Sequence, residues 1–277
     1  MTLAEFVTGI LAVSLALAVA MSVAWLVWFA TRNSGWIDTG WTFGLGLTGI
    51  AAALWPFDGH AAPRQVLVAA LIAAWALRLG LHIAFRTAGI VDDPRYAKLV
   101  GQWGGNANWQ MFLLAQKQAL ISIPLAIAML LAAGNPAPDL RLQDYLAAAV
   151  FVFGIAGEAL ADAQLRRFRA DPANAGKVCD RGLWAWSRHP NYFFEWVCWL
   201  AFPLFAIDLT GGHPFGWLAL IGPACMYWVL VHVTGIPYLE AHMLERRGEA
   251  FRAYQARTSA FFPVPPRSPE AHTGARP

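Results

Sequence analysis

The sequence predicts an all-α integral membrane protein with about seven transmembrane helices. Of its 277 residues, 58% are hydrophobic and only 13% are charged, about half the charged fraction of an average soluble domain. Apolar runs of roughly 20 residues recur along the chain, and a helix of that length crosses the hydrocarbon core of a bilayer. Basic residues gather in alternate connections between these runs, as they do in membrane proteins of defined orientation.

The seven predicted spans are, in order, Glu5–Ala30, Trp36–Phe57, Gln65–Phe85, Trp109–Ala133, Leu142–Leu165, Asn191–Ile207 and Pro214–Thr234. The second is interrupted by four glycines, which can also allow close contact between helices. The sixth is short and contains Pro203. The first is predicted to be a retained helix, because no basic residue precedes its apolar run and that run is longer than the core of a signal peptide.

The distribution of Lys and Arg predicts the orientation. With the N-terminus outside and the C-terminus in the cytoplasm, sixteen of the twenty Lys and Arg residues fall in cytoplasmic connections, as the positive-inside rule requires. The net charge of +3 therefore belongs to the membrane surface, and it does not form the soluble basic patch that would suggest binding of nucleic acid.

We predict one membrane-embedded domain at residues 1–262, which includes an amphipathic helix on the cytoplasmic surface at 236–257. The Pro-rich tail at 263–277 is predicted to be disordered. The three cysteines have no metal-binding spacing, so we predict neither a disulfide nor a metal site.

The most polar part of the chain begins on the fifth predicted helix. Glu158 and Asp162 share one helix face, with Glu158 a full turn deeper, and Lys and Arg residues follow directly. One interpretation is an ordinary ion pair between Asp162 and Arg166 at the end of a helix. We favour a site for a polar ligand, because charged residues inside a membrane usually mark such sites.

The connection leads into a Ser-Arg-His-Pro-Asn-Tyr turn. Pro190 suits the first position of a helix, and the start of a helix presents unpaired N–H groups that favour a phosphate or an amide oxygen. Asn191 and Glu195 are four residues apart on one face, so the two can hold a single carboxamide. The alternative is helix capping with a surface Arg-His pair.

These segments resemble a known family. Glu158–Trp199, with the earlier pieces Asn33–Trp41 and Trp75–Tyr96, is similar to the bacterial membrane family allied with steroid 5-alpha-reductases. The wider group includes the sterol C14- and C7-reductases. The resemblance implies a seven-helix fold in the bacterial inner membrane that binds NADPH on its cytoplasmic side. A dinucleotide site of the Rossmann type is not expected, because no GxGxxG follows a strand.

The resemblance also implies which residues bind the cofactor. Carried over by motif, the adenosine and phosphates contact Asp162, Arg166, Arg169 and Lys177, and the nicotinamide end contacts Asn191, Glu195 and Trp199. The complete set predicted to bind NADPH is Arg95, Tyr96, Glu158, Asp162, Arg166, Arg169, Lys177, His189, Asn191, Tyr192, Glu195, Trp199 and Tyr238.

The substrate half of the site departs from the family. Steroid reductases polarise the substrate ketone with a carboxylate on the second helix and a Tyr on the third. Asp38 supplies a carboxylate on the second helix, but Ile83 stands roughly where the Tyr is expected. The candidate proton donors are, in order of preference, Asp38, Tyr192, Tyr238 and His82.

The expected function is NADPH-dependent hydride transfer to an activated C=C of a lipophilic, steroid- or sterol-like substrate. The expected partners are this substrate, taken from the bilayer, and membrane lipids, with no nucleic acid and no obligate protein partner. One alternative is an S-adenosylmethionine-dependent methyltransferase of the isoprenylcysteine or phospholipid type, which shares the Arg-His-Pro-x-Tyr turn. A methyl donor has no phosphates, so the six cations between Asp162 and Trp199 favour the reductase. A non-catalytic lipid-binding or scaffold protein is the third possibility, and it would tolerate loss of Asp162, Asn191 and Glu195.

Overall fold

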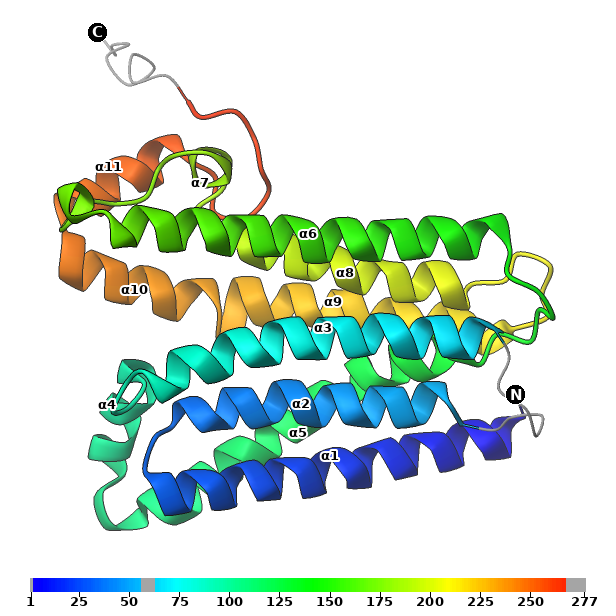
Figure 1. Ribbon diagram of the computed structural model, residues 1–277. Coiled ribbons are helices and arrows are strands. Elements are labelled where there is room, and N and C mark those ends of the chain that lie inside the picture. Colours follow the sequence, from blue (N-terminus) through cyan, green and yellow to red (C-terminus); the bar gives the residue numbers. More distant parts are fainter. Residues whose placement is uncertain (1, 56–62, 268–277) are drawn as a thin grey trace, which may run out of the picture. The chain divides into compact units, whose positions relative to one another are not determined.

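The computed structural model describes residues 2–55 and 63–267, with the side chains of all of these except Pro94 and Arg95. Within this part the chain is helical, and its one β-type pairing is an isolated bridge between Ser187 and Ser259. The α-helices (Figure 1) are α1 Leu3–Thr31, α2 Gly35–Ala53, α3 Pro63–Ala88, α4 Pro94–Trp103, α5 Ala107–Ala133, α6 Leu142–Ala170, α7 Leu183–Trp186, α8 Pro190–Ala206, α9 Ile221–Trp228, α10 Ile236–Arg247 and α11 Glu249–Arg257. The predicted all-α class is confirmed.

Five helical segments of the described chain are long and apolar enough to cross a membrane. They are Leu3–Thr31, Pro63–Ala88, Tyr96–Ala133, Leu142–Ala170 and Pro214–Arg247, and they contain the first, third, fourth, fifth and seventh predicted spans. The second and sixth predicted spans form helices α2 and α8, of 19 and 17 residues. Neither belongs to the apolar set, because glycines interrupt α2 and α8 is short.

The chain forms two compact units. Unit 1 comprises Met1–Ala149 and Leu200–Cys225, and unit 2 comprises Val150–Trp199 and Met226–Pro277. The division passes through α6, α8 and α9, so each of these helices contributes to both units.

Close helix packing in unit 1 depends on small residues of α2, which packs against α1, α3 and α5 (Figure 1). A Cβ added at Gly40 would lie 2.4 Å from the Cβ of Ala24 on α1, and one added at Gly46 would lie 2.4 Å from the Cβ of Ala76 on α3. The glycines that interrupt the apolar pattern are therefore the places where neighbouring helices approach, as the sequence suggested.

A buried ion pair fixes one end of unit 1. Arg64 and Asp144 have side chains only 1% and 0% exposed, and Arg64 Nη2 lies 2.9 Å from Asp144 Oδ2. The remaining guanidinium N–H groups donate to the backbone carbonyls of Asn135, Ala137 and Asp139. Because every part of the guanidinium has an acceptor, this buried charge holds the α5–α6 connection against the start of α3.

The C-terminal part of unit 2 differs from the predicted single helix at 236–257. The structure has two helices, α10 and α11, which are separated by Gly248 with φ 50°. A side chain would be strained at that φ, and glycine adopts it freely. The tail at 263–277 was predicted to be disordered, but its first residues are hydrogen-bonded within unit 2, since Val264 N donates to Trp186 O at 3.1 Å. Residues 268–277 lie outside the described chain.

Candidate functional site

Helices α6 and α8 approach each other closely in unit 2, and two glycines allow this. A Cβ added at Gly157 would lie 2.2 Å from the ring of Phe194, and one added at Gly154 would lie 2.5 Å from Cys198 Sγ. The thiol of Cys198 donates in turn to Phe151 O at 3.7 Å. This contact brings the polar side chains of the next turns together.

The polar side chains next to this contact form a buried cluster, which we call the α6–α8 cluster. It consists of Glu158, Asp162, Asn191, Glu195 and Trp199. The three carboxylates are only 4%, 6% and 5% exposed, in chain order. Asn191 Nδ2 donates to Asp162 Oδ1 in a long hydrogen bond of 3.4 Å, and Trp199 Nε1 donates to Glu195 Oε1 at 2.9 Å. All five were predicted to bind the cofactor, and the structure brings them together.

Cations gather on the connection that leaves this cluster. They are exposed and form what we call the cationic loop, made of Arg166, Arg167, Arg169, Lys177 and Arg181. Within the described chain, four of them make no ion pair, namely Arg166, Arg167, Lys177 and Arg181. The loop is nevertheless ordered, because its 3-10 turn is capped by Asp171 and Leu183 N donates to Gln164 Oε1 at 2.9 Å.

The turn before α8 is held by one carboxylate on α10. Glu240 accepts from Arg188 Nε at 2.7 Å and from Arg188 Nη2 at 3.1 Å, and it also accepts from Gln255 Nε2 at 2.7 Å. His189 Nε2 lies 3.1 Å from Glu240 Oε1. Burial lowers the pKa of His189, against the opposing effect of Glu240, so the neutral ring donates to the carboxylate. The Arg-His pair is therefore largely buried, which contradicts the alternative of a surface pair.

The C-terminal segment completes the support of this turn. Arg188 N donates to Ser259 O at 2.8 Å, and Ser187 Oγ donates to Phe261 O at 2.8 Å. Tyr254, only 2% exposed, hydrogen-bonds to Trp184 O, and burial raises the pKa of its hydroxyl. The segment thus fixes the backbone from which α8 starts.

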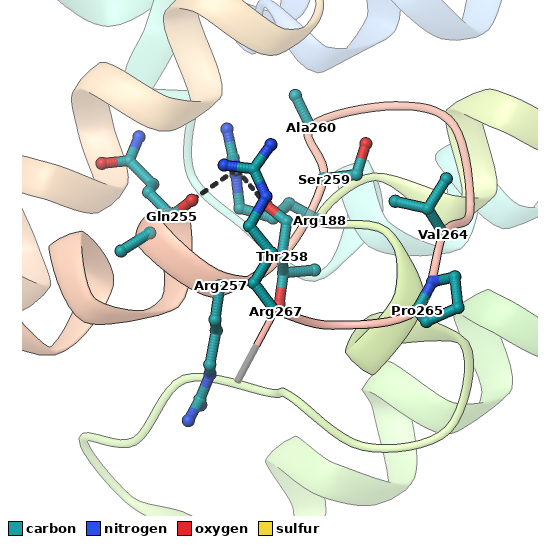
Figure 2. Close-up of a pocket in the computed structure, with 10 residues that line it drawn as sticks. Arg188, Gln255, Arg257, Thr258, Ser259, Ala260, Val264, Pro265 and Arg267 are labelled. Carbon is teal, nitrogen blue, oxygen red and sulfur yellow. Dashed lines mark hydrogen bonds between the residues drawn. The ribbon is translucent and has the colours of Figure 1, made fainter. Parts of the chain in front are cut away.

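A pocket of about 330 Å³ lies beside the support of the turn (Figure 2). It is lined by Arg188, Gln255, Ala256, Arg257, Thr258, Ser259, Ala260, Val264, Pro265 and Arg267. Arg188 Nη1 donates to Gln255 O at 3.2 Å and also to Thr258 O. The lining contains none of the residues predicted to bind the cofactor, so this pocket is distinct from the predicted site.

Two predicted tyrosines lie in unit 2 outside the α6–α8 cluster. Tyr192 is half-buried and stacks on His189, with ring centroids 5.6 Å apart and an interplanar angle of 13°. Tyr238, in the first turn of α10, is 57% exposed. The high exposure of Tyr238 gives it no fixed acid geometry, whereas Tyr192 is oriented by its stacking.

In unit 1, the predicted acid Asp38 belongs to a chain of hydrogen bonds. Tyr96 Oη on α4 donates to Asp38 Oδ1 at 2.7 Å, and Gln118 Nε2 on α5 donates to Tyr96 Oη at 3.2 Å. His82 lies half-buried on α3 of the same unit. The predicted cofactor residue Arg95 has a side chain outside the described part of the chain.

The segments around this Asp38–Tyr96–Gln118 chain are the two early pieces that the sequence singled out. Asn33 Nδ2 donates to Thr87 O at 3.0 Å and to Ile90 O at 2.9 Å, and Ser34 N donates to Asp92 Oδ1 at 2.7 Å. The start of α2 is therefore bound to the connection between α3 and α4. This is why a tyrosine beyond the third helix reaches a carboxylate on the second.

A family model described as "Protein of unknown function (DUF1295)" matches residues 24–258. The chain belongs to the DUF1295 family. The matched span of this DUF1295 protein contains the α6–α8 cluster, the cationic loop and the Asp38–Tyr96–Gln118 chain. The uncharacterized protein C594.04c of the fission yeast Schizosaccharomyces pombe is 26% identical over 275 residues, covering 87% of this chain and 76% of the relative. No solved structure matches.

Sequence reasoning missed three contacts in this DUF1295 chain. It did not pair Glu240 with the Arg-His turn, and it did not pair Tyr96 with Asp38. It also gave no role to Gln118, although a polar residue inside a predicted span is a signal of function. The signal for Glu240 was weaker, because a glutamate on an amphipathic helix is ordinary.

Proposed function

We propose that this protein is a membrane-bound NADPH-dependent reductase that transfers a hydride to an activated C=C of a lipophilic, steroid- or sterol-like substrate. The observation that carries the proposal is the cationic loop directly beyond the α6–α8 cluster. Guanidinium and ammonium groups suit phosphates, including the 2'-phosphate that distinguishes NADPH from NADH. A cofactor with several phosphates fits four exposed cations of this loop that make no ion pair within the described residues, namely Arg166, Arg167, Lys177 and Arg181.

The buried end of the same site fits an uncharged polar group. Asn191 offers an amide, and Asp162 and Glu195 offer carboxylate oxygens, within adjacent turns of α6 and α8. A carboxamide has both a donor and an acceptor, so it can be oriented by such a set. When bound, NADPH supplies the hydride. The chain's own part is to hold the two ends of the cofactor and to exclude water from the carboxamide end.

Reduction of a C=C also needs a proton, and Asp38 with Tyr96 is the best candidate to supply it. The phenolic hydrogen of Tyr96 lies in a 2.7 Å hydrogen bond to Asp38 Oδ1, so the pair holds one proton between two oxygens. It can polarise a conjugated carbonyl or deliver a proton to carbon.

We further propose seven spans, with α2 and α8 crossing as well as the five apolar segments. The C-terminus and the cationic loop would then face the cytoplasm, in the bacterial inner membrane. The concentration of Lys and Arg in one set of connections supports this orientation.

The test is nucleotide binding by the detergent-purified protein, followed by thermal unfolding. NADPH at about 100 times its Kd should stabilise the protein by about 2.7 kcal/mol, and NADH should stabilise it less. Arg166→Ala should weaken NADPH binding roughly tenfold or more, since hydrogen bonds to charged groups contribute about 1.5–3 kcal/mol. Arg252→Ala is the matched control, because this exposed α11 residue pairs with Glu249. Stabilisation by S-adenosylmethionine alone would overturn the proposal and favour the methyltransferase.

A further inference from the structure

The Asp38–Tyr96–Gln118 chain has a fixed direction, which its carboxylate sets. A carboxylate can only accept hydrogen bonds, so the Tyr96 hydroxyl must donate to Asp38. The phenolic oxygen then accepts from Gln118. Gln118 must therefore present its NH2 group to Tyr96, which fixes the orientation of an amide that geometry alone leaves ambiguous. Its carbonyl oxygen Oε1 lies on the other side.

Gln118 Oε1 is the last polar atom in this series of hydrogen bonds. The atom is buried, and within the described residues it makes no hydrogen bond. Buried carbonyl groups almost always have a partner, because leaving one unpaired costs the full free energy of removing it from water. A missing donor at this position indicates a ligand or a water molecule that supplies one.

Two polar side chains joined to Gln118 by hydrogen bonds already donate elsewhere. Ser122, one turn beyond Gln118 on α5, donates to the backbone oxygen of Gln118 at 2.7 Å. Trp41 Nε1 donates to Ser122 Oγ at 2.7 Å, and the Trp41 ring lies edge-on to Trp75 at 6.2 Å. The surroundings thus combine aromatic rings with one open acceptor, a combination that suits an apolar molecule with a single polar group.

We propose that Gln118 Oε1 binds the hydroxyl group of a lipophilic alcohol in unit 1. A ketone, an ester or an ether has no hydrogen to donate to this oxygen, and the hydroxyl of Tyr96 already donates to Asp38. The identity of this alcohol as the substrate rests on the proposed function, but its binding does not. The inference narrows the substrate class, because it adds a hydroxyl group, bound at Gln118 Oε1, to the lipid that carries the activated C=C.

The experiment compares alcohols with their methyl ethers, which keep the oxygen and the apolar body but lack the donor. The probes are cholesterol, dodecanol and the methyl ether of each, titrated into the detergent-purified full-length chain without nucleotide. The apparent Kd is taken from the thermal unfolding midpoint. At least one alcohol should bind about two- to tenfold more tightly than its ether, as one neutral hydrogen bond predicts. If no alcohol binds more tightly than its ether, the proposal is overturned, and Gln118 Oε1 then holds only water.

Matched variants locate the preference. Gln118→Met keeps the size and shape of the side chain but removes the acceptor, so the preference for alcohol should disappear. Gln116→Met is the control, because Gln116 lies on the same helix but donates to Ser22 Oγ at 3.1 Å. It takes no part in the hydrogen bonds that join Asp38, Tyr96 and Gln118. The proposal fails if Gln118→Met retains the preference, or if Gln116→Met loses it. NADPH binding is measured separately, so failure of this proposal and failure of the reductase proposal are distinguishable.

Discussion

Replacing Glu240 with Gln should destabilise unit 2 and disorder the turn that begins α8. Glu240 is 14% exposed and Arg188 is 11% exposed, so neither charge is well solvated. The carboxylate accepts two hydrogen bonds from Arg188, one from His189 and one from Gln255. Gln keeps one acceptor oxygen but removes the charge, and it places an NH2 group against the guanidinium.

The expected loss is about 2–3 kcal/mol in the free energy of unfolding. Hydrogen bonds to charged groups contribute about 1.5–3 kcal/mol, and removing one partner of a fully buried pair costs about 3–5 kcal/mol. Because the pair is partly exposed, the expected loss falls in the lower of these two ranges. For a chain of this size, a loss of this magnitude should lower the midpoint of thermal unfolding by roughly 4–12 °C.

Thermal unfolding in detergent, followed by intrinsic tryptophan fluorescence, measures the loss. The Arg188→Gln and Glu240→Gln variants with their double variant form a cycle, and a coupling free energy of about 1–3 kcal/mol is expected for charges in contact. Glu249→Gln is the control, because this 84% exposed glutamate pairs with a 64% exposed Arg252 and should matter little. Additive effects of the two substitutions would refute the idea that their charges hold the turn.

Two further predictions concern the same unit. Gly157→Ala should destabilise the protein by about 1–3 kcal/mol, because its Cβ would lie 2.2 Å from the rigid ring of Phe194. The control is Gly101→Ala, which has open space around it and should be nearly neutral in the same unfolding assay. For pH, burial lowers the pKa of His189 below its ordinary 6.5, so the unfolded chain binds the proton more readily than the folded one, and stability should be lost as the pH falls below 6.5. Comparing unfolding midpoints at pH 7.5 and pH 5 checks this, and a His189→Gln variant with undiminished pH dependence would contradict it.

The sequence predicts the apolar helices of this fold well, because contact with lipid imposes a composition that can be recognised locally. Helices α1, α3, α5 and α6 are confirmed within a few residues of the predicted spans. It fails at residues 236–257, where a single helix was predicted. Gly248 adopts a positive φ there, and the amphipathic pattern on both sides does not reveal the break.

Part of the candidate site can also be predicted from residues that are close together in the sequence. Glu158 and Asp162 share a face of one helix, and Asn191 and Glu195 share a face of another, so helical periodicity alone groups each pair. The contact between these two helix faces cannot be predicted from periodicity, because it depends on Gly157, which leaves room for the ring of Phe194. Its signal in the sequence was a small residue within an apolar helix.

The remaining contacts join residues that are far apart in the chain. Glu240 lies 51 residues from His189, and Tyr96 lies 58 residues from Asp38. No periodicity connects such positions, because the geometry arises from how connections fold back on helices. In the case of Tyr96, the decisive contacts are those of Asn33 and Ser34 with the α3–α4 connection. The sequence shows Asn33–Trp41 and Trp75–Tyr96 as two separate segments, and nothing in either segment indicates that the two are in contact.

Helices α2 and α8, which stand outside the apolar set, carry several of the predicted site residues. Asp38 lies on α2, and Asn191, Glu195 and Trp199 lie on α8. A helix that contacts lipid around much of its surface must be apolar over a long run, whereas a helix enclosed by protein can hold glycines, a carboxylate and an amide if each has a partner. More than half of α2 is buried, and the carboxylates of α8 and α6 are almost inaccessible. Enclosure by protein therefore accounts for the polar groups on these two helices, and in such a chain the least convincing predicted span is the first place to look for a site.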